Sequence, residues 1–376
     1  MSSLQVTELS CPSCGAPLRF STRRVLSTCP FCDSQIAAKW ASDNSRAVSI
    51  GDALPSAVVP STVQREAFEE ALLDWLAAGP YTPDDILSRA LVQEHRCLLV
   101  PFYRVEGSWK ATFTAAAGFR RTESYVDHET RHKPDGTTER VRVTKTRQTT
   151  DWRPMSGEAS GDFQIMVPAS EQVPDGLRDF CTETASGTPS AEEMTAAHLD
   201  DAIAEPFTQP VSVLWDEHGA PQLDRVVTAE IEGRIPGDRS RNIRYDLERT
   251  DKHVTEWHQP FWLAAYRYDD TLYHFIVDGT DVSRSSGRRP SDEDRVQAVK
   301  ALFKPTWRWA KIWAVIFVVG LLLVVPAFVA VFVGLPHVIY LYVQADREKT
   351  VMLLASQTLR QKVLAEVKQR RGLGGG

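Results

Sequence analysis

The sequence predicts a multidomain protein of three parts, and one observation predicts each part. Four cysteines in two C-x-x-C pairs near the N-terminus predict a small, metal-stabilised β ribbon. Short aromatic and β-branched runs between turn signals predict a central α+β body with antiparallel hairpins. An uncharged stretch over 312–343 predicts a C-terminal transmembrane helix or hairpin, and an amphipathic helix follows it.

The predicted metal ligands are Cys11, Cys14, Cys29 and Cys32, which read C-P-S-C and then C-P-F-C. Paired knuckles at this separation are typical of a structural Zn²⁺ site, in which four thiolates close a tetrahedron. We expect one structural Zn²⁺ ion, because a segment of ~40 residues buries too little apolar surface to fold unaided. Two disulfides or a redox pair are the alternative, which the lack of a signal peptide disfavours.

The uncharged stretch over 312–343 exceeds the ~20 residues that one helix needs to cross a bilayer. Tryptophans at its entry and tyrosines at its exit are typical of interfacial belts. Basic residues on both flanks favour a hairpin that bends at Pro326 or over 334–336, whereas the length of each arm favours a single tilted helix. Both topologies remain open, and with them the side on which the C-terminus lies.

These features divide the chain at boundaries that composition suggests. The predicted units are a zinc ribbon over 1–40, a linker over 41–60, an α+β cytoplasmic body over 61–290, a juxtamembrane helix over 291–311, a membrane anchor over 312–343, and a C-terminal helix with a Gly-rich tail over 344–376. Two hairpins that begin Pro-Phe-aromatic are compatible with related halves over 61–185 and 186–290.

Within the body, apolar spacing and caps predict helices that begin near residues 61 and 82, and another over 189–204. Strands are predicted over 97–105 and 109–117 around a turn at 106–108, over 161–168, and over 211–215 and 226–235. Two further hairpins are expected, one around 134–136 and one around Asp269 and Asp270.

Charge is unevenly distributed along the chain, whose net charge is −6. From residue 288 to the end there are 14 Lys and Arg against 6 Asp and Glu, so the remainder is strongly acidic. A basic membrane-proximal segment suits an anionic lipid surface, and an acidic body disfavours non-specific nucleic-acid binding. We therefore expect the body on the cytoplasmic side of a membrane.

No residue is predicted to be catalytic or to bind an organic cofactor. The segment from His128 to His132 matches H-E-x-x-H, but this chemistry needs a helix, and the flanking sequence is typical of strands. A polar hairpin with two solvated histidines is the simpler interpretation. Neither a Gly-rich phosphate loop nor a G-x-S-x-G motif is present in the sequence.

Several segments together resemble a known family. They are the C-P-S-C-G and C-P-F-C knuckles, L-V-P-F-Y from Leu99, W-R-P-M-S-G from Trp152, and the aromatic stretch from Pro260 to Phe275. The chain resembles bacterial TFIIB-type zinc-ribbon membrane proteins, which are often labelled primosomal or replication-restart-helicase-like. Some of these are linked to phage-shock-protein-A homologues, which the resemblance implies as protein partners. The resemblance also implies a location at the bacterial inner (cytoplasmic) membrane, with the N-terminal body in the cytoplasm. The chain has no Walker A sequence, so helicase activity is not implied.

The sequence therefore favours a non-enzymatic, membrane-anchored adaptor that recruits proteins of the envelope-stress or membrane-remodelling machinery. In that case, Leu18, Phe20, Phe31 and Ile36 form either a docking surface or the small core of the ribbon. The alternative function is a tethered nucleic-acid-binding module that uses Arg19, Arg23 and Arg24. A third, minor alternative is a hydrolase whose acid and base groups do not stand out in the sequence.

Overall fold

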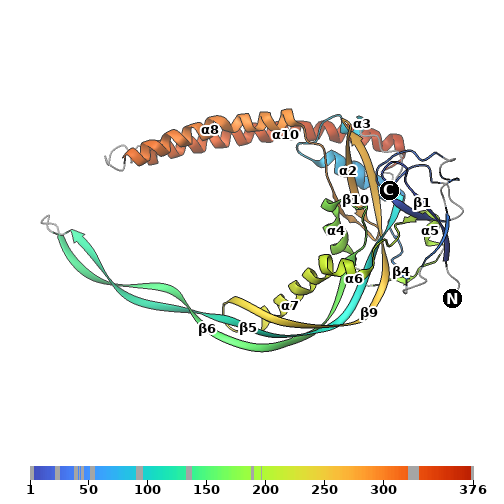
Figure 1. The fold of residues 1–376 in the computed structure, drawn as a ribbon. Coiled ribbons are helices and arrows are strands. Elements are labelled where there is room, and N and C mark those ends of the chain that lie inside the picture. The colour runs from blue at the N-terminus through green and yellow to red at the C-terminus, as the bar shows by residue number, and fades with distance from the viewer. Residues whose placement is uncertain are drawn as a thin grey trace.

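The computed structural model describes residues 4–21, 26–37, 41, 43, 46–50, 56–89, 96–132, 138–187, 190–195, 197–320 and 330–373. A large mixed sheet forms the centre of the molecule, and two long arms extend from it towards the same side (Figure 1). One arm is a two-stranded ribbon and the other is a pair of helices. The two chain termini lie at the opposite end (Figure 1).

The sheet has 11 strands, and its main path runs β11-β10-β9-β5-β8-β2-β1-β3. The strands are β1 Leu4–Ser10, β2 Pro17–Phe20, β3 Arg46–Ile50, β4 Ser56–Val58, β5 Arg96–His132, β6 Thr138–Pro168, β7 Glu192–Glu193, β8 Ala202–Ala204, β9 Arg239–Tyr268, β10 Thr271–Asp278 and β11 Asp281–Gly287. The pairs β5–β6, β9–β10 and β10–β11 are antiparallel hairpins, as predicted for the body. However, β4 pairs with β9 and β8 with β5 in parallel, so the body is one large mixed sheet and not a set of antiparallel hairpins alone.

The predicted turn at 106–108 is also wrong, because β5 continues through it without reversing. The ladder between β5 and β9 shows only a β-bulge between Glu106 and Gly107. Gly107 is needed there because the neighbouring strand comes close. A Cβ at this position would lie 2.5 Å from the carbonyl oxygen of Thr250. The glycine that suggested a turn therefore serves close packing between strands.

The helices are α2 Arg65–Ala78, α3 Ile86–Arg89, α4 Asp175–Ser186, α5 His198–Asp201, α6 Val211–Leu214, the π-helix η1 Trp215–Gly219, α7 Ala220–Arg234, α8 Glu293–Gly320, the π-helix η2 Ala330–Gly334 and α10 Leu335–Arg371. The strands predicted over 211–215 and 226–235 are thus helical. In α7, Leu223, Val227 and Ile231 recur every four positions and bury one helical face in the core that β5 and β6 share. The helix predicted over 189–204 shrinks to α5 between two short strands.

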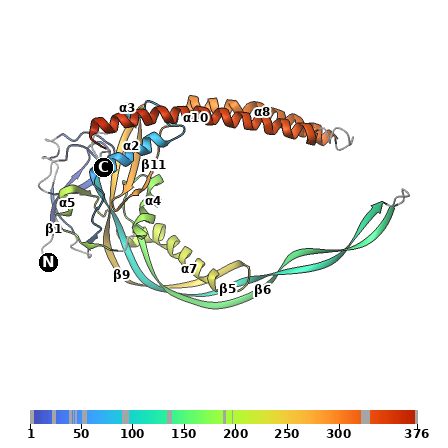
Figure 2. The ribbon, with the colours of Figure 1, turned by 180° about the vertical axis from the view of Figure 1, so that it is seen from behind.

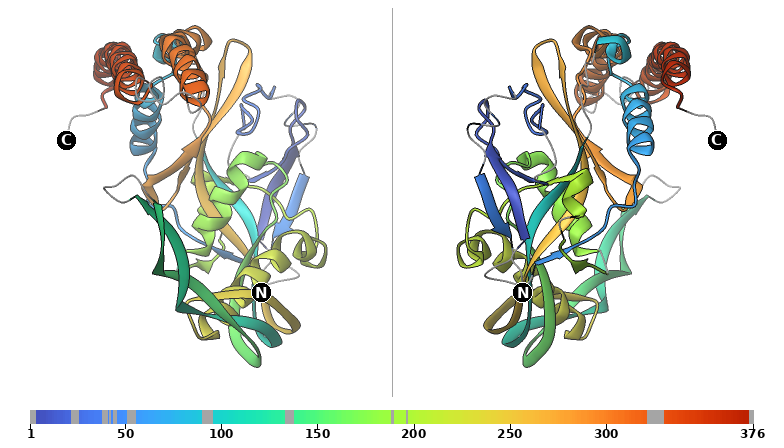
Figure 3. Two further views of the ribbon diagram at one scale, coloured as in Figure 1. Left: turned by 90° about the vertical axis from the view of Figure 1, so that its left-hand side faces the viewer. Right: turned by 90° about the vertical axis from the view of Figure 1, so that its right-hand side faces the viewer.

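Each side of the central sheet is covered by different elements (Figure 3). On one side, the N-terminal strands and α4 pack on Leu98, Val100 and Phe102 of β5. On the other side, α2 packs its Phe68 and Leu72 face against β9 and β10, and the end of α10 joins the same core. The Cys-rich segment is therefore an integral edge of the body sheet and shares its core.

The ribbon arm is the end of the β5–β6 hairpin that extends beyond β9. The pairing of β5 with β9 ends at Gly118, whereas its pairing with β6 continues to His132 and Thr138. The hairpin predicted around 134–136 agrees with this register, although residues 133–137 lie outside the described residues. The second predicted hairpin is also confirmed, with left-handed φ values of 45° and 61° at Asp269 and Asp270.

The helical arm consists of α8 and α10, which run antiparallel (Figures 1 and 2). Trp313 donates a hydrogen bond of 3.3 Å from its Nε1 to Nδ1 of His337, and Phe303 packs on Tyr342. The predicted transmembrane segment over 312–343 is wrong. No described helix, up to residue 320 and from 330 onward, is long and apolar enough to cross a membrane.

The physical reason is that the apolar stretch is divided between the two helices of this arm. Basic residues of α8 continue up to Lys311, and α10 carries charged side chains from Asp346 onward. Residues 321–329, including the proposed bend at Pro326, lie outside the described residues, and Gly334 has helical angles rather than a bend. The transmembrane description and the inner-membrane location inferred from it are corrected accordingly.

A buried arginine attaches the helical arm to the body. Arg360 of α10 is fully buried and donates to the carbonyl oxygens of Ala77, Thr82 and Gly79, at 3.0, 2.7 and 2.5 Å. Its Nη1 also lies 3.0 Å from a carboxylate oxygen of Asp84. Because α2 ends at Ala78, the guanidinium satisfies carbonyl oxygens that the end of that helix leaves free.

We expect Arg360→Met to loosen the attachment of the helical arm. The substitution leaves the carbonyl oxygens and Asp84 without their donor, a change that costs about 3–5 kcal/mol when a buried partner is removed. Hydrogen exchange should show faster exchange in α10 and at the end of α2, and the urea midpoint should fall. The matched control is Arg370→Met, since that side chain is 82% exposed on the same helix. Equal effects of the two substitutions would contradict this role.

Candidate metal centre

Two tight turns of the same geometry hold the four N-terminal cysteines. In the first, the amide of Cys11 donates to Ala16 and that of Gly15 to the carbonyl of Cys11, both at 2.9 Å. In the second, the amide of Cys29 donates to the carbonyl of Ser34 and that of Asp33 to the carbonyl of Cys29, both at 3.0 Å. The residue after each second cysteine is left-handed, with φ of 78° at Gly15 and 57° at Asp33, which glycine and aspartate tolerate best.

These turns bring the four sulfur atoms of Cys11, Cys14, Cys29 and Cys32 within 4.8 Å of one another, so the cluster could hold a metal ion. The Cys11 and Cys32 sulfurs are 3.8 Å apart, and those of Cys14 and Cys29 are 3.7 Å apart. A disulfide would require about 2.05 Å. The cysteines are therefore unbridged, which removes the disulfide alternative that the sequence left open.

Ser34 is a residue of this cluster that the sequence analysis missed. Its hydroxyl lies 3.0 Å from the sulfur of Cys32 and 3.5 Å from that of Cys11. Burial works against ionisation of Cys11, but hydrogen bonds from Ser34 and from nearby backbone amides lower its pKa to about 7. Burial raises the pKa of Cys14 to about 11. The one sequence signal for Ser34 was its position, two residues after Cys32. The equivalent position of the first knuckle is Ala16, which has no hydroxyl group.

The cluster is fixed rigidly to the body. Leu18, Phe20, Phe31 and Ile36 are all buried in the core shared with β5, so they do not form an exposed docking surface. His274 of β10 lies 2.8 Å from the carbonyl oxygen of Phe31 through its Nε2, which ties the second knuckle to the sheet. The metal centre thus lies where the N-terminal Cys-rich segment packs against the central sheet.

The basic cluster proposed for the ribbon is only partly visible. Arg19 forms an ion pair of 2.8 Å with Glu8 on the neighbouring strand, and its side chain is 20% exposed. Arg23 and Arg24 lie outside the described residues. Of the three arginines, the one that is described is therefore already paired within the fold.

The H-E-x-x-H segment lies on strand β5, not on a helix. Successive side chains of a strand point to opposite faces, so His128 and Glu129 diverge. Glu129 forms an ion pair of 2.8 Å with Lys145. The side chain of His132 is outside the described residues. This arrangement differs from the helical geometry that a metalloprotease needs.

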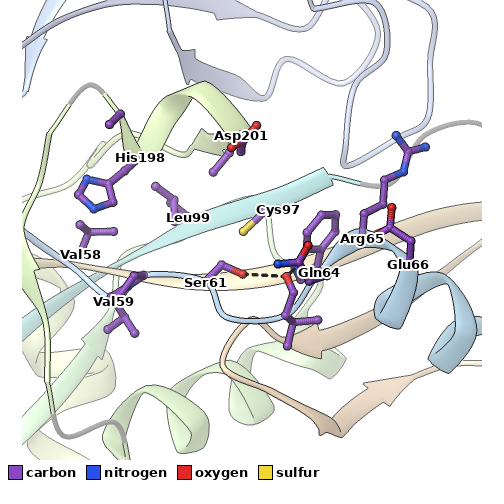
Figure 4. A pocket seen from close by; sticks show the side chains of 15 residues that line it. Val58, Val59, Ser61, Gln64, Arg65, Glu66, Cys97, Leu99, His198 and Asp201 are labelled. Atoms are coloured by element: carbon purple, nitrogen blue, oxygen red, sulfur yellow. Dashed lines mark hydrogen bonds between the residues drawn. The ribbon is translucent and has the colours of Figure 1, made fainter. Parts of the chain in front are cut away.

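A cavity of ≈ 540 Å³ lies between the first turn of α2, the start of β5 and α5 (Figure 4). Cys97 and His198 line it, a pair that invites comparison with a nucleophile and its base. However, His198 accepts from the amide of Thr195 through Nδ1 at 3.0 Å, and its Nε2 lies 2.7 Å from Glu192. Since both ring nitrogens are engaged within their own segment, His198 is poorly placed to act as a general base.

Glu205 is a buried carboxyl group that follows β8, next to the metal-binding strands. It accepts hydrogen bonds from the hydroxyl of Ser170 at 2.6 Å and from the amide of Glu171 at 2.9 Å. Burial nevertheless dominates and raises the pKa of Glu205 to about 7. Nearby, burial lowers the pKa of His258 to about 4. These groups are neutral in the fold at pH 6, which is unusual for a carboxyl group.

Comparisons with known proteins do not assign a function. No family model matches the chain, and no solved structure matches it significantly. A protein of Bacillus subtilis (strain 168) named "Uncharacterized protein YdjG" is 22% identical over 337 residues, which cover 78% of this chain and 93% of that protein. The similarity extends over nearly the whole relative, and its printed name records no activity. The resemblance to TFIIB-type zinc-ribbon proteins stays a prediction.

The first prediction from this region concerns pH. The pKa of Glu205 rises from 4.5 in the unfolded chain to about 7 in the folded one. As pH increases, Glu205 therefore loses its proton at a lower pH in the unfolded state than in the folded state. Between pH 4.5 and 7 the folded state therefore binds more protons, and Glu205 lowers stability by about 3 kcal/mol across that window.

Urea unfolding at pH 5 and pH 7.5 tests this expectation. His258 acts in the opposite direction below pH 6.5, since its folded pKa is depressed, so the comparison must use a variant and not the wild type alone. Relative to wild type, Glu205→Gln should gain about 2 kcal/mol more at pH 7.5 than at pH 5, because a smaller part of the effect is already present at pH 5. An identical pH dependence in both proteins would refute the assignment.

The second prediction concerns the metal. Cys29→Ala removes one of four ligands, and we expect the metal content per chain to fall at least about tenfold, because a closed structural site needs all four. Elemental analysis of the purified full chain measures this. Cys181→Ala is the control, since Cys181 is also buried but belongs to α4, away from the cluster. Retention of the metal by the Cys29 variant would exclude the four-cysteine site.

Proposed function

We propose that the chain is a non-enzymatic adaptor that a single structural Zn²⁺ ion stabilises. The sulfur geometry supports zinc, because Zn–S bonds of about 2.3 Å in a tetrahedron require sulfur pairs about 3.8 Å apart. The two measured pairs lie at 3.8 and 3.7 Å. Four thiolates leave no position for water or substrate, so the ion would have a structural role.

The observation that carries the adaptor proposal is the exposed apolar surface of the helical arm. Trp307, Phe332 and Tyr340 are 68%, 69% and 66% exposed, and other large apolar side chains of α8, η2 and α10 accompany them. Monomeric proteins rarely expose extended apolar surface without an interaction that uses it. We assign this surface to a protein partner, and we name it the apolar arm surface.

The resemblance to zinc-ribbon proteins suggests the identity of that partner. Relatives in that family are linked to phage-shock-protein-A homologues, so we propose such a homologue, within the envelope-stress machinery, as the protein that the apolar arm surface binds. Recognition by a long helix pair suits a helical partner that presents its own apolar stripe. The metal centre and the sheet would then act as the rigid base of the arm.

The nucleic-acid alternative for the Cys-rich ribbon has less support. It depended on three arginines, of which Arg19 is paired with Glu8 and the other two lie outside the described residues. A hydrolase also lacks support, because His198, which lines a cavity together with Cys97, is held by Glu192 and Thr195.

We expect the full chain to co-purify with a phage-shock-protein-A homologue from its own organism and to bind it when both are purified. The double variant Trp307→Gln/Tyr340→Gln should lose at least about tenfold in affinity, since each substitution removes an exposed aromatic anchor. The matched control is Val213→Gln/Val226→Gln, two exposed apolar residues on α6 and α7. Absence of binding by the wild type, or equal loss in both variants, would reject the proposal.

A further inference from the structure

Charge is sorted by face along the ribbon arm, which comprises residues 119–132 of β5 and 138–151 of β6. Residues directly opposite each other in an antiparallel pair share one face, and β5 and β6 pair even-numbered with even-numbered residues. Apart from Val126, the described even-numbered face bears hydroxyl, amide, imidazole and guanidinium side chains, and it has no carboxylate. Its described members are Arg120, Thr122, Ser124, Val126, His128, Thr130, Arg140, Arg142, Thr144, Thr146, Gln148 and Thr150. We call it the hydroxyl–arginine face.

All carboxylates of the described part of this arm lie on the other face, where basic residues neutralise them. Lys145 lies 2.8 Å from both Asp127 and Glu129, and Arg147 lies 3.2 Å from Glu123. Arg147 also covers the ring of Tyr125. These pairs explain why several side chains of this face are only half exposed. The face is therefore internally compensated and offers little net charge to a partner.

The hydroxyl–arginine face, in contrast, is fully exposed along most of its length. Within the part of the chain that the structure describes, no ion pair or hydrogen bond engages the guanidinium groups of Arg120, Arg140 or Arg142. Free guanidinium groups on one face, with no carboxylate beside them, attract anions. The carboxylate of Asp238, at the base of the arm, is occupied by the backbone amide of Arg120.

The same basic face continues onto the body through β9. Arg239, Arg241 and Arg244 lie opposite Gly118, Ala116 and Thr114, on the even-numbered side of the sheet, and all three are exposed. Trp152 crosses the strand above Gly118, and Arg241 lies 3.9 Å above its ring. Positive charge therefore gathers in two places, at the base of the arm (Arg120, Arg239, Arg241 and Arg244) and near its end (Arg140 and Arg142). Neutral, mostly hydroxyl and amide side chains connect the two groups, and we call the whole stretch the strip. Further into the body, the carboxylates of Asp246 and Glu248 follow on the same side of β9.

We propose that this strip binds the phosphate backbone of double-stranded nucleic acid, independently of the protein partner assigned above. Phosphate oxygens accept hydrogen bonds from arginine, serine and threonine side chains, which are the residues that this face supplies. Side chains on one strand face recur every ~6.7 Å, about twice the 3.4 Å axial spacing of phosphates on one DNA strand.

A duplex fits this strip better than a single strand or a small anion does. Single-strand binding relies on aromatic side chains that stack with bases. The described tryptophan of this face, Trp152, is covered by Arg241, and Tyr125 lies on the opposite face beneath Arg147. A small anion needs a cavity that converges on it, and this face is open. The ribbon twists along its length (Figure 1), so a long partner with continuous charge can follow it. The major groove also admits a two-stranded β-ribbon.

The experiment measures binding of the full chain to a fluorescent 30-base-pair duplex of mixed sequence in 50 mM salt, by anisotropy, followed by a salt titration. Arg140→Gln/Arg142→Gln should weaken binding about tenfold or more and should reduce the slope of log K against log salt by about 1.8, since each phosphate contact contributes about 0.9. The control, Arg121→Gln/Arg147→Gln, removes the same charge from the opposite face and should retain affinity within about twofold.

A second variant protects the test against misfolding at the end of the arm. Arg239→Gln/Arg244→Gln changes the base of the strip, within the three-stranded part of the sheet, and should weaken binding similarly. No binding by the wild type, or equal weakening by the control and both test variants, would overturn the proposal. So would tighter competition by polyglutamate than by the unlabelled duplex, because that result would identify an acidic protein as the partner.

Discussion

The structure depends on the antiparallel pairing of two long strands, β5 and β9. Their ladder runs from Arg96 opposite Leu263 to Gly118 opposite Arg239. The Cys-rich ribbon joins this ladder through β8, which pairs with β5 on one side and contacts β2 on the other. The ribbon arm is the continuation of β5 beyond its partner. Because neighbouring strands satisfy each other's backbone groups, a slip of one residue would reverse every buried and exposed face at once.

The helical arm relies on a different kind of constraint. Arg360 places a guanidinium in the interior, where burying a charge is costly unless every donor finds an acceptor. Its acceptors are mainly carbonyl oxygens near the end of α2, which would otherwise lack partners. Arg295 of α8 holds the same loop through Thr82 and Asp84, so both helices of the arm converge on one point. Polar side chains thus fix the position of an arm whose outer surface is largely apolar.

Sequence reasoning succeeded where short-range chemistry is decisive. The four cysteines, the face of α2 that contains Phe68, and the turn at Asp269 follow from local spacing. It failed where tertiary contacts override local signals. Gly107 suggested a turn, but it allows the neighbouring strand to pack closely against β5. The apolar run over 312–343 suggested a membrane-spanning segment, but it is divided between the two helices of the helical arm. The helix expected after the apolar stretch buries two polar residues, Ser356 and Arg360, besides the apolar Ala345 and Leu364. No sequence pattern predicts that a charged side chain such as Arg360 is buried and attaches one helix to another.

The charge on the ribbon arm shows why net charge alone is a poor guide to binding. The chain carries −6 overall and its body is strongly acidic, which argued against non-specific nucleic-acid binding. A two-stranded ribbon, however, separates its faces by strand alternation, so acidic and basic residues that are adjacent in sequence point in opposite directions. Salt screens interactions beyond about 8 Å at physiological ionic strength, so a partner senses the nearest face more than the distant acidic body. The segregation therefore allows an acidic protein to present a locally basic surface, and it could be recognised only once the pairing register of β5 and β6 was known.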